Sequence, residues 1–166
     1  VRMAEEVMQN FRRPERQALV EYVTLENDFS DTPAGRTMVP GHAIESMWFV
    51  MQIYRHTGNK QRLREAAETI RWATEQGWDK EFGGLYLAID IDGKEPLFWN
   101  NADTKIWWVF SEALYALLVG QMQDRGHDDE GGEQGRQDPR YRDRSNRLQA
   151  AMVGDVEPSE TYHRGA

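Results

Sequence analysis

Residues 40–49 read Pro40-Gly41-His42-Ala43-Ile44-Glu45-Ser46-Met47-Trp48-Phe49. This stretch predicts the start of a helix that is apolar on nearly all sides. Pro40 suits the first helical turn, because the N–H that proline lacks has no partner there. Gly41 leaves room for another group to approach the backbone closely. His42 and Glu45 are three residues apart, so they share one face of the first turn and their side chains can meet.

His42 is a candidate acid/base group. The positive end of the helix dipole favours its neutral imidazole, whereas the carboxylate of Glu45 opposes this effect and can fix the tautomer and the ring orientation. A neutral, oriented imidazole suits a general base near pH 7. Spacing alone favours the alternative, an ordinary helix-start histidine beside a solvated glutamate, because short motifs recur by chance.

The pattern of apolar residues predicts a mainly helical body. Gly58 is expected to end the first long helix, as glycine commonly does, and the helix after it is amphipathic. The expected helices are Arg2–Asn10, Pro14–Val20, Ala43–His56, Lys60–Glu75 and Thr104–Gly120, the last capped by Asp103.

A β-hairpin is expected between the last two helices. Its strands would be Phe82–Ile89 and Leu97–Trp99, and its turn Asp90–Gly93, where Asp-Gly favours a tight reversal. One helix that is apolar nearly all round, followed by one that is amphipathic, suits the inner and outer helices of an α/α barrel. We therefore expect an all-α fold with a small hairpin.

Composition limits the classes of protein and of partner. The chain has 166 residues, which is room for one domain at most, and it contains no cysteine, which excludes disulfides and thiolate metal sites. Its net charge of −8 argues against nucleic-acid binding. No apolar run is long enough to span a membrane, and no signal-peptide core is visible. These features favour a cytoplasmic protein, and the absence of Met at position 1 suggests that the chain begins partway through a longer one.

The chain consists of two different kinds of sequence. All six Trp and all six Phe lie in the first 110 residues, within a body expected over residues 1–120. Residues 121–166 carry seven Arg and no Lys, and they are too polar to bury a core. Two interpretations stay open for this segment: a disordered tail, or a frameshift in GC-rich DNA that makes it non-native.

A second candidate site lies in the third long helix. Glu112 follows Trp108 by four residues, so the two share a helix face. An indole can cover the apolar C–H surface of a sugar while a carboxylate accepts hydrogen bonds from its hydroxyls. Trp48, on the face of Glu45, can extend the same wall. The alternative is that these aromatic residues are core and that Glu112 is solvated.

Metal and phosphate sites are not expected. Asp79 and Glu81 lie beside the pair Gly83-Gly84, but their spacing matches no Ca²⁺ loop, and a turn fits better. There is no glycine-rich phosphate loop and no nucleophile elbow.

Three ordered motifs resemble the N-acylglucosamine 2-epimerase family, also called renin-binding-protein-like. The first combines Asp31-Thr32-Pro33 and Gly35-Arg36 with Pro40-Gly41-His42-Ala43-Ile44-Glu45. The others are Asp79-Lys80-Glu81-Phe82-Gly83-Gly84-Leu85-Tyr86 and Lys105-Ile106-Trp107-Trp108-Val109-Phe110-Ser111-Glu112-Ala113. The resemblance covers roughly residues 15–120 and implies part of an (α/α)6 barrel.

The resemblance also implies chemistry on an open-chain sugar such as an N-acylglucosamine, an N-acylmannosamine or mannose. A base removes the C2 proton, an enediolate forms, and reprotonation at C2 or C1 gives the epimer or the ketose. His42 matches one catalytic group of the family, with Glu45 as its orienting partner, and Glu112 matches a residue of the sugar pocket. No metal or cofactor is required. The expected partner is a small-molecule sugar, and a homodimer is possible for the full-length protein.

Some positions depart from the family pattern. Phe110 stands where the family has a histidine, and Val109 where it has a proline. A second catalytic histidine is expected in a later Phe/Tyr-His-x-Pro-Arg motif, which Tyr162-His163-Arg164 matches only by coincidence. The chain therefore holds an incomplete site, and two alternatives stay open: an inactive fragment or sugar-binding remnant, and another α/α-barrel enzyme such as a glycoside hydrolase that uses Glu45 and Glu112.

A partial barrel would expose the apolar surface of its inner helix. The residues expected there are Met47, Phe49, Val50 and Ile53. Such a surface favours self-association.

Overall fold

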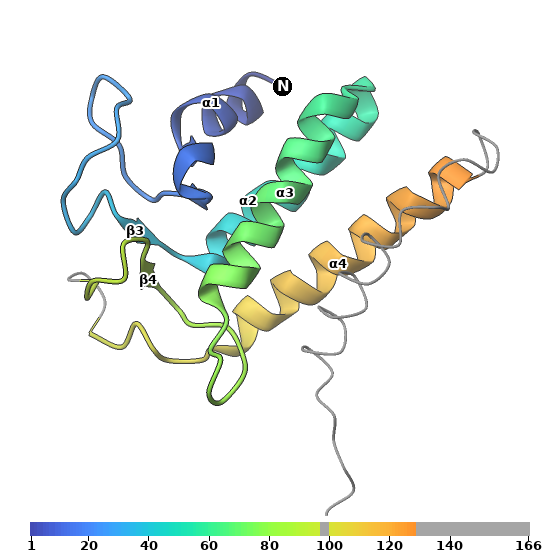
Figure 1. The fold of residues 1–166 in the computed structure, drawn as a ribbon. Helices are drawn as coiled ribbons and strands as arrows, with labels where there is room; N and C mark the ends of the chain where they lie inside the picture. Colours follow the sequence, from blue (N-terminus) through green and yellow to red (C-terminus); the bar gives the residue numbers. More distant parts are fainter. Residues whose placement is uncertain (97–99, 129–166) are drawn as a thin grey trace, which may run out of the picture. The chain divides into compact units, whose positions relative to one another are not determined.

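Two long helices, α2 (Pro40–Thr57) and α3 (Lys60–Gly77), form a hairpin at the centre of the structure (Figure 1). The computed structural model describes residues 1–96 and 100–128, with side chains described up to residue 120. The chain divides into two units, Val1–Gly126 and His127–Ala166, and the hairpin belongs to the first. The other elements are α1 (Arg2–Asn10), β1 (Arg12–Arg13), the 3-10 helix Pro14–Arg16, β2 (Ala18–Leu19), β3 (Thr37–Met38), β4 (Ile89–Asp90) and α4 (Trp107–Asp128).

The α2–α3 hairpin contributes a large part of the core. The predicted end of α2 is confirmed, since Gly58 caps it with a φ of 73°. The side chain of Asn59 then accepts a hydrogen bond from the Arg62 N–H at 3.1 Å and so begins α3. The largest buried side chains of the two helices are Ile44, Met47, Met51, Tyr54 and Trp72.

The expected hairpin strand over Phe82–Ile89 is wrong for all but its last residue. Gly83 and Gly84 have φ values of 70° and 90°, so the chain turns at the point where an extended strand was expected. Strand β4 pairs instead with β3, which comes about fifty residues earlier, with Thr37 opposite Asp90. The turn after it is confirmed, because the Gly93 N–H donates to the Asp90 carbonyl at 2.9 Å. The expected return strand, residues 97–99, lies outside the described residues.

Two other expectations need correction. Of Pro14–Val20, only Pro14–Arg16 is helical, because Gln17 adopts a left-handed conformation with a φ of 52° and Ala18–Leu19 then pairs with β1. The last helix begins at Trp107 rather than Thr104, so Asp103 does not cap it, and it continues past residue 120 to Asp128. Residues 129–166, which include most of the expected tail, lie outside the described residues.

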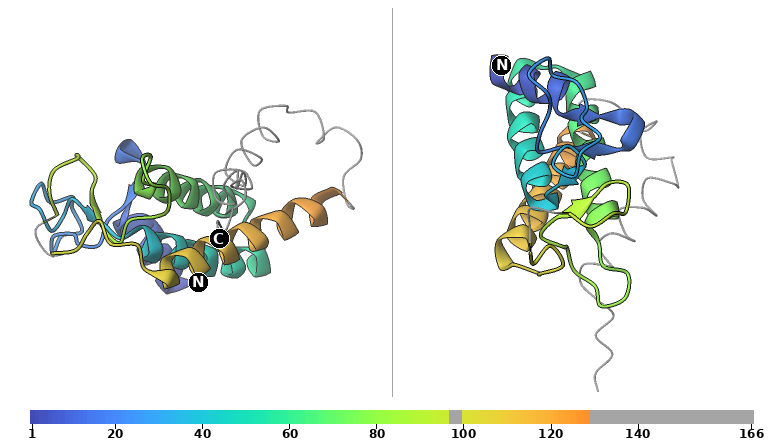
Figure 2. Two further views of the ribbon diagram at one scale, coloured as in Figure 1. Left: turned by 90° about the horizontal axis from the view of Figure 1, so that it is seen from below. Right: turned by 90° about the vertical axis from the view of Figure 1, so that its left-hand side faces the viewer.

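The loops that carry the strands gather at the end of the hairpin where α2 begins and α3 ends (Figures 1 and 2). Strand β3 leads through Val39 directly into α2, and α4 begins beside the first turn of α2, because Trp108 stacks on His42. Further along α2 and α4, Trp48 contacts Glu112 and then Gln52 contacts Tyr115, so residue numbers rise together on the two helices. Helices α2 and α4 therefore run in the same direction.

The structure is mainly helical, as expected, and the described residues do not close a barrel. The prediction that four apolar residues of α2 are exposed is wrong for two of them, because Met47 and Val50 are buried. Phe49 is exposed and Ile53 is partly exposed. Within residues 1–96 and 100–128, no helix has the length and apolar character needed to cross a membrane.

Candidate active site

His42 lies in the first turn of α2, with 46% of its side chain exposed. Its Nδ1 is 3.1 Å from Oε2 of Glu21. A carboxylate can only accept a hydrogen bond, so Nδ1 carries the proton and donates it. Among the described residues, no group hydrogen-bonds Nε2 of this ring, and in the neutral imidazole that nitrogen keeps its lone pair.

The hydrogen-bond partner of His42 is Glu21, whereas the sequence predicted Glu45. Glu45 contributes its charge alone: the hydrogen bond to Glu21, followed by the charges of Glu21 and Glu45, raises the pKa of His42 above its ordinary value despite partial burial. The expectation that the helix dipole would favour the neutral ring is therefore overridden by two carboxylates. Glu21 was missed because its partner lies 21 residues along the chain, beyond the reach of any helical spacing.

Trp108, from the first turn of α4, covers one face of the His42 ring. The two ring centroids are 5.4 Å apart, and the planes meet at 30°. Gly41 permits this approach, as predicted, because a Cβ built there would lie 2.4 Å from Cζ3 of Trp108. The face of Trp108 that contacts His42 is thus not free to carry a sugar.

Trp48 and Glu112 also come together across α2 and α4. The indole N–H of Trp48 donates to Oε2 of Glu112 at 2.8 Å, and both side chains are partly buried. The edge of Tyr115 packs on Trp48, with centroids 4.6 Å apart and planes at 73°. One carboxylate oxygen of Glu112 is therefore engaged within the protein, and among the described residues no group donates a hydrogen bond to Oε1.

The five predicted site residues lie on two neighbouring helices. His42, Glu45 and Trp48 lie on α2, and Trp108 and Glu112 on α4; two contacts, His42 with Trp108 and Trp48 with Glu112, join them. The structure thus brings together residues that are more than sixty positions apart in the sequence.

A buried ion-pair cluster supports the strand that leads into α2. The guanidinium of Arg36 is almost fully buried, and it bonds Asp90 at 3.0 Å and Asp31 at 2.7 Å. Arg36 lowers the pKa of Asp31 chiefly through this hydrogen bond. Arg36, from the first motif, thus joins the start of β3 to Asp90 of β4.

The turn expected at Asp79 and Glu81, just before Gly83-Gly84, is present. Asp79 accepts hydrogen bonds from the N–H groups of Glu81 and Phe82, at 2.9 and 3.2 Å, and from Nζ of Lys105 at 2.5 Å. Phe110, which stands in place of the family histidine, packs against Gly84, where a Cβ would lie 2.9 Å from its ring. Within the described part of the chain, no three His, Asp or Glu side chains are grouped as a metal site would require.

Comparison with protein families and curated proteins gives a consistent result. The family model for N-acylglucosamine 2-epimerase (GlcNAc 2-epimerase) matches residues 1–152, a range that runs past the expected body into the charged segment. The N-acylglucosamine 2-epimerase of Mus musculus is 39% identical over 106 residues, which is 59% of this chain and 25% of that protein. The enzyme of the same name from Bos taurus is 34% identical over 123 residues, or 72% of this chain and 28% of that protein. The chain spans about a quarter of the length of these relatives.

Two solved structures share the fold. A D-mannose isomerase matches with a TM-score of 0.56 at 19% identity, covering 89% of this chain and 34% of that one. A sugar epimerase from a ruminal bacterium matches with a TM-score of 0.54 at 16% identity, covering 95% of this chain and 35% of that one. The extent of the family match and the identities to the curated relatives show that the chain belongs to the N-acylglucosamine 2-epimerase family.

Proposed function

We propose that this chain supplies part of the active site of a sugar 2-epimerase or aldose–ketose isomerase that acts on an open-chain sugar. The observation that carries this proposal is the state of His42. Its ring is fixed by Glu21 and Trp108, it is partly open to solvent, and no described group occupies Nε2. An oriented imidazole with a free nitrogen suits proton transfer at a carbon next to a carbonyl group.

In the proposed reaction, Nε2 of His42 takes the proton from C2 of the open-chain sugar. The electrons of the C–H bond form the C1–C2 double bond of an enolate, which is an enediolate where C2 carries a hydroxyl group, and the charge moves to the oxygen on C1. Return of a proton to C2 from the opposite face gives the epimer. For a sugar with a C2 hydroxyl, return of a proton to C1, with transfer of the hydroxyl proton from O2 to O1, gives the ketose. Epimerisation requires a second acid/base group on the opposite face, which the family resemblance places in a later motif.

The neighbouring residues would bind the sugar. Glu112 would accept a hydrogen bond from a sugar hydroxyl through Oε1, while Trp48 holds its other oxygen. Trp108 would support His42 on one face and offer its remaining edge to the apolar side of the sugar. Glu45 would add negative charge near the imidazolium that forms after proton transfer.

The names of the relatives support a choice of substrate class. The curated relatives are called N-acylglucosamine 2-epimerases, and one solved structure is a D-mannose isomerase. We therefore propose an N-acylglucosamine, N-acylmannosamine or mannose-type substrate. A glycoside hydrolase has less support, because the relatives are named as epimerases and an isomerase.

The test is exchange of the C2 proton with solvent in D₂O. A full-length chimera in which this chain replaces the matching segment of the Mus musculus relative supplies the parts of the domain that the chain lacks. It is incubated with N-acetylglucosamine, N-acetylmannosamine or mannose, and deuterium at C2 is followed by NMR. His42→Ala should slow the exchange by about 10²- to 10⁴-fold, the usual contribution of a general base.

His56→Ala is the matched control, because this exposed histidine lies in the last turn of α2. It should leave the exchange rate unchanged. Exchange that persists at the unsubstituted rate in the His42→Ala chimera would refute the proposed role. An inactive wild-type chimera that folds would favour the interpretation of the chain as an inactive or sugar-binding remnant.

A further inference from the structure

We propose that Glu21 is the positioning residue of this site: its carboxylate holds the Nδ1–H of His42 and thereby presents Nε2 as the proton acceptor. The tautomer of the His42 ring can be measured on the chain itself. The role of Glu21 in turnover rests on the proposed function. No sequence motif singles out Glu21, and the inference comes from its contact with His42.

The contact between Glu21 and His42 is directional. Oε2 of Glu21 lies 3.1 Å from Nδ1, and only 23% of the Glu21 side chain is exposed. A neutral imidazole carries one N–H, and the hydrogen bond at one nitrogen decides which of the two carries it. Since the carboxylate accepts, the proton stays on Nδ1 and the lone pair stays on Nε2.

The backbone at Glu21 is held in place by two hydrogen bonds, from its own N–H and from that of Val20. Its N–H donates to the carbonyl of Thr37 at 3.1 Å, and the N–H of Val20 donates to the carbonyl of Phe11 at 3.1 Å. Thr37 is fully buried in β3, five residues before His42. Glu21 and His42 are thus attached to the same short strand, and little conformational freedom remains to be lost when they meet.

Other groups around His42 do not replace this contact. Two charged groups face the ring: Glu21 from the segment after β2, and Glu45 from α2. Helix α4 contributes the uncharged ring of Trp108. Among the described residues, Glu45 has no hydrogen bond to the imidazole, so Glu45 adds negative charge while Glu21 adds both charge and direction.

The same carboxylate would assist the chemical step. When Nε2 takes a proton from C2, the ring becomes an imidazolium and both of its nitrogens carry N–H groups. The Glu21 carboxylate then stabilises the new positive charge through a hydrogen bond that already exists, as an orienting carboxylate does in other histidine-based sites. Glu21 does not touch the reacting carbon, so its effect is exerted through His42.

The test begins with the 166-residue chain labelled with ¹⁵N in its histidines. Nitrogen chemical shifts distinguish the Nδ1–H tautomer from the Nε2–H tautomer, and a pH series gives the titration of each ring. The wild type should show His42 in the Nδ1–H form above its titration. A wild-type ring in the Nε2–H form would overturn the proposal without the need for any variant.

Glu21→Gln keeps the shape and the acceptor oxygen but removes the charge. It should move the titration of His42 to lower pH and mix the two tautomers, because the amide can also turn its NH₂ toward the ring. Glu21→Asp, which keeps the charge on a shorter side chain, should restore part of the shift. The resonance of His56, about 21 Å away along α2, should be the same in all variants. An unchanged His42 titration in Glu21→Gln would overturn the proposal.

The kinetic arm uses the full-length chimera with the C2 exchange assay. Glu21→Gln should lower kcat by about 10²-fold with little change in KM, and it should move the acidic limb of the pH profile to lower pH. A purely structural role would lower the melting temperature and leave the acidic limb in place. Failure of this inference can be distinguished from failure of the proposed function. If His42→Ala loses the exchange but Glu21→Gln leaves the pH profile unchanged, only the inference about Glu21 is refuted.

Discussion

At the scale of single residues, Gly41 controls the approach of α4 to the site. Its missing side chain lets the Trp108 ring lie against the backbone of α2 and stack on His42. The sequence predicted that some group would approach here, because glycine has no side chain to block a close approach to the backbone. It could not identify Trp108, since the contact depends on how two distant helices pack.

Gly41→Ala should destabilise the chain by about 1–3 kcal/mol, because the new methyl group would overlap the Trp108 ring and force it away from His42. Urea unfolding followed by tryptophan fluorescence measures the change. Gly120→Ala is the matched control: Gly120 lies inside α4, and a Cβ there meets nothing within 4 Å. The control should stabilise the chain by roughly 0.5–1 kcal/mol. Two changes of the same sign and size would contradict the packing at Gly41.

Asp79 makes the stability depend on pH. The hydrogen bond from Lys105, followed by those from the N–H groups of Glu81 and Phe82, holds the pKa of Asp79 well below its ordinary value of 3.8. A lowered pKa means that the stabilisation is complete above 3.8 and is lost as the pH falls through the native pKa. Asp79→Asn should therefore be less stable than the wild type at pH 7, and the difference in the free energy of unfolding should shrink below pH 3.8. A difference that stays constant across this range would contradict the ion pair with Lys105.

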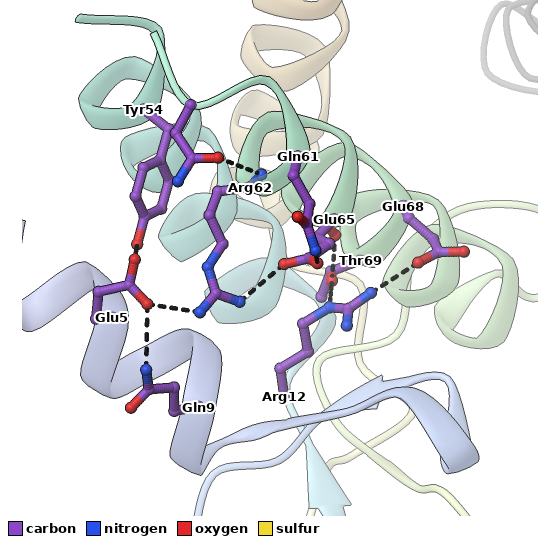
Figure 3. Close-up of polar contacts among 10 residues, drawn as sticks. Glu5, Gln9, Arg12, Tyr54, Gln61, Arg62, Glu65, Glu68 and Thr69 are labelled. Carbon is purple, nitrogen blue, oxygen red and sulfur yellow. Dashed lines mark hydrogen bonds and ion pairs between the residues drawn. The ribbon is translucent and has the colours of Figure 1, made fainter. Parts of the chain in front are cut away.

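At the scale of elements, a polar network joins α1 to the α2–α3 hairpin (Figure 3). The guanidinium of Arg62 lies between Glu5 and Glu65, at 2.6 and 2.8 Å. Glu5 also accepts a hydrogen bond of 2.5 Å from the buried Tyr54 hydroxyl, and this environment raises the pKa of Tyr54 to about 12. Helix α1 is short, so these contacts, together with the burial of Ala4 and Met8, keep it in place.

Tyr54→Phe should lower the free energy of unfolding by about 1–3 kcal/mol, the range for removing a hydrogen bond to a charged group. The loss should be visible first in α1, as faster amide hydrogen exchange over Arg2–Asn10. Tyr115→Phe is the control, because this residue is exposed and its hydroxyl accepts a single hydrogen bond among the described residues, from Gln52 at 3.2 Å. The control should change stability by less than about 0.5 kcal/mol. Equal losses in the two variants would refute a role for Tyr54 in holding α1.

The helices could be predicted well and the strands could not. The ends of α2 and α3 were predicted within about three residues, because Pro40, Gly58 and Asn59 mark them locally. The strands failed because β3 pairs with β4 across about fifty residues, and no local pattern reports such pairing. The candidate site shows the same difference between local and long-range features. His42 and Glu45 could be found as a local motif, whereas the position of Glu21 depends on the long-range hydrogen bond from its N–H to the Thr37 carbonyl.

At the scale of the whole unit, Val1–Gly126 leaves an apolar stripe uncovered on α4. Trp107, Leu114 and Leu118 are 78%, 56% and 59% exposed, and they lie on one face of the helix at spacings of seven and four residues. Val109, Ala113 and Ala116 on the opposite side are buried. Phe49 extends the stripe onto α2, because the Trp48 ring touches both Phe49 and Tyr115. The uncovered surface thus belongs to α4 more than to α2, where the sequence placed it.

A contiguous exposed stripe of this kind favours contact with a second copy of the chain. The isolated chain should therefore self-associate, and sedimentation velocity over a series of concentrations should show the mass rising with concentration. Leu114→Lys with Leu118→Lys should shift the chain toward the monomer, because two charges on the stripe cannot be buried without partners. Gln61→Lys with Ala67→Lys adds the same charge at exposed positions of α3 and should leave the association unchanged. A wild-type chain that stays monomeric at every concentration, or a loss of association in both double variants, would show that the α4 stripe does not drive self-association.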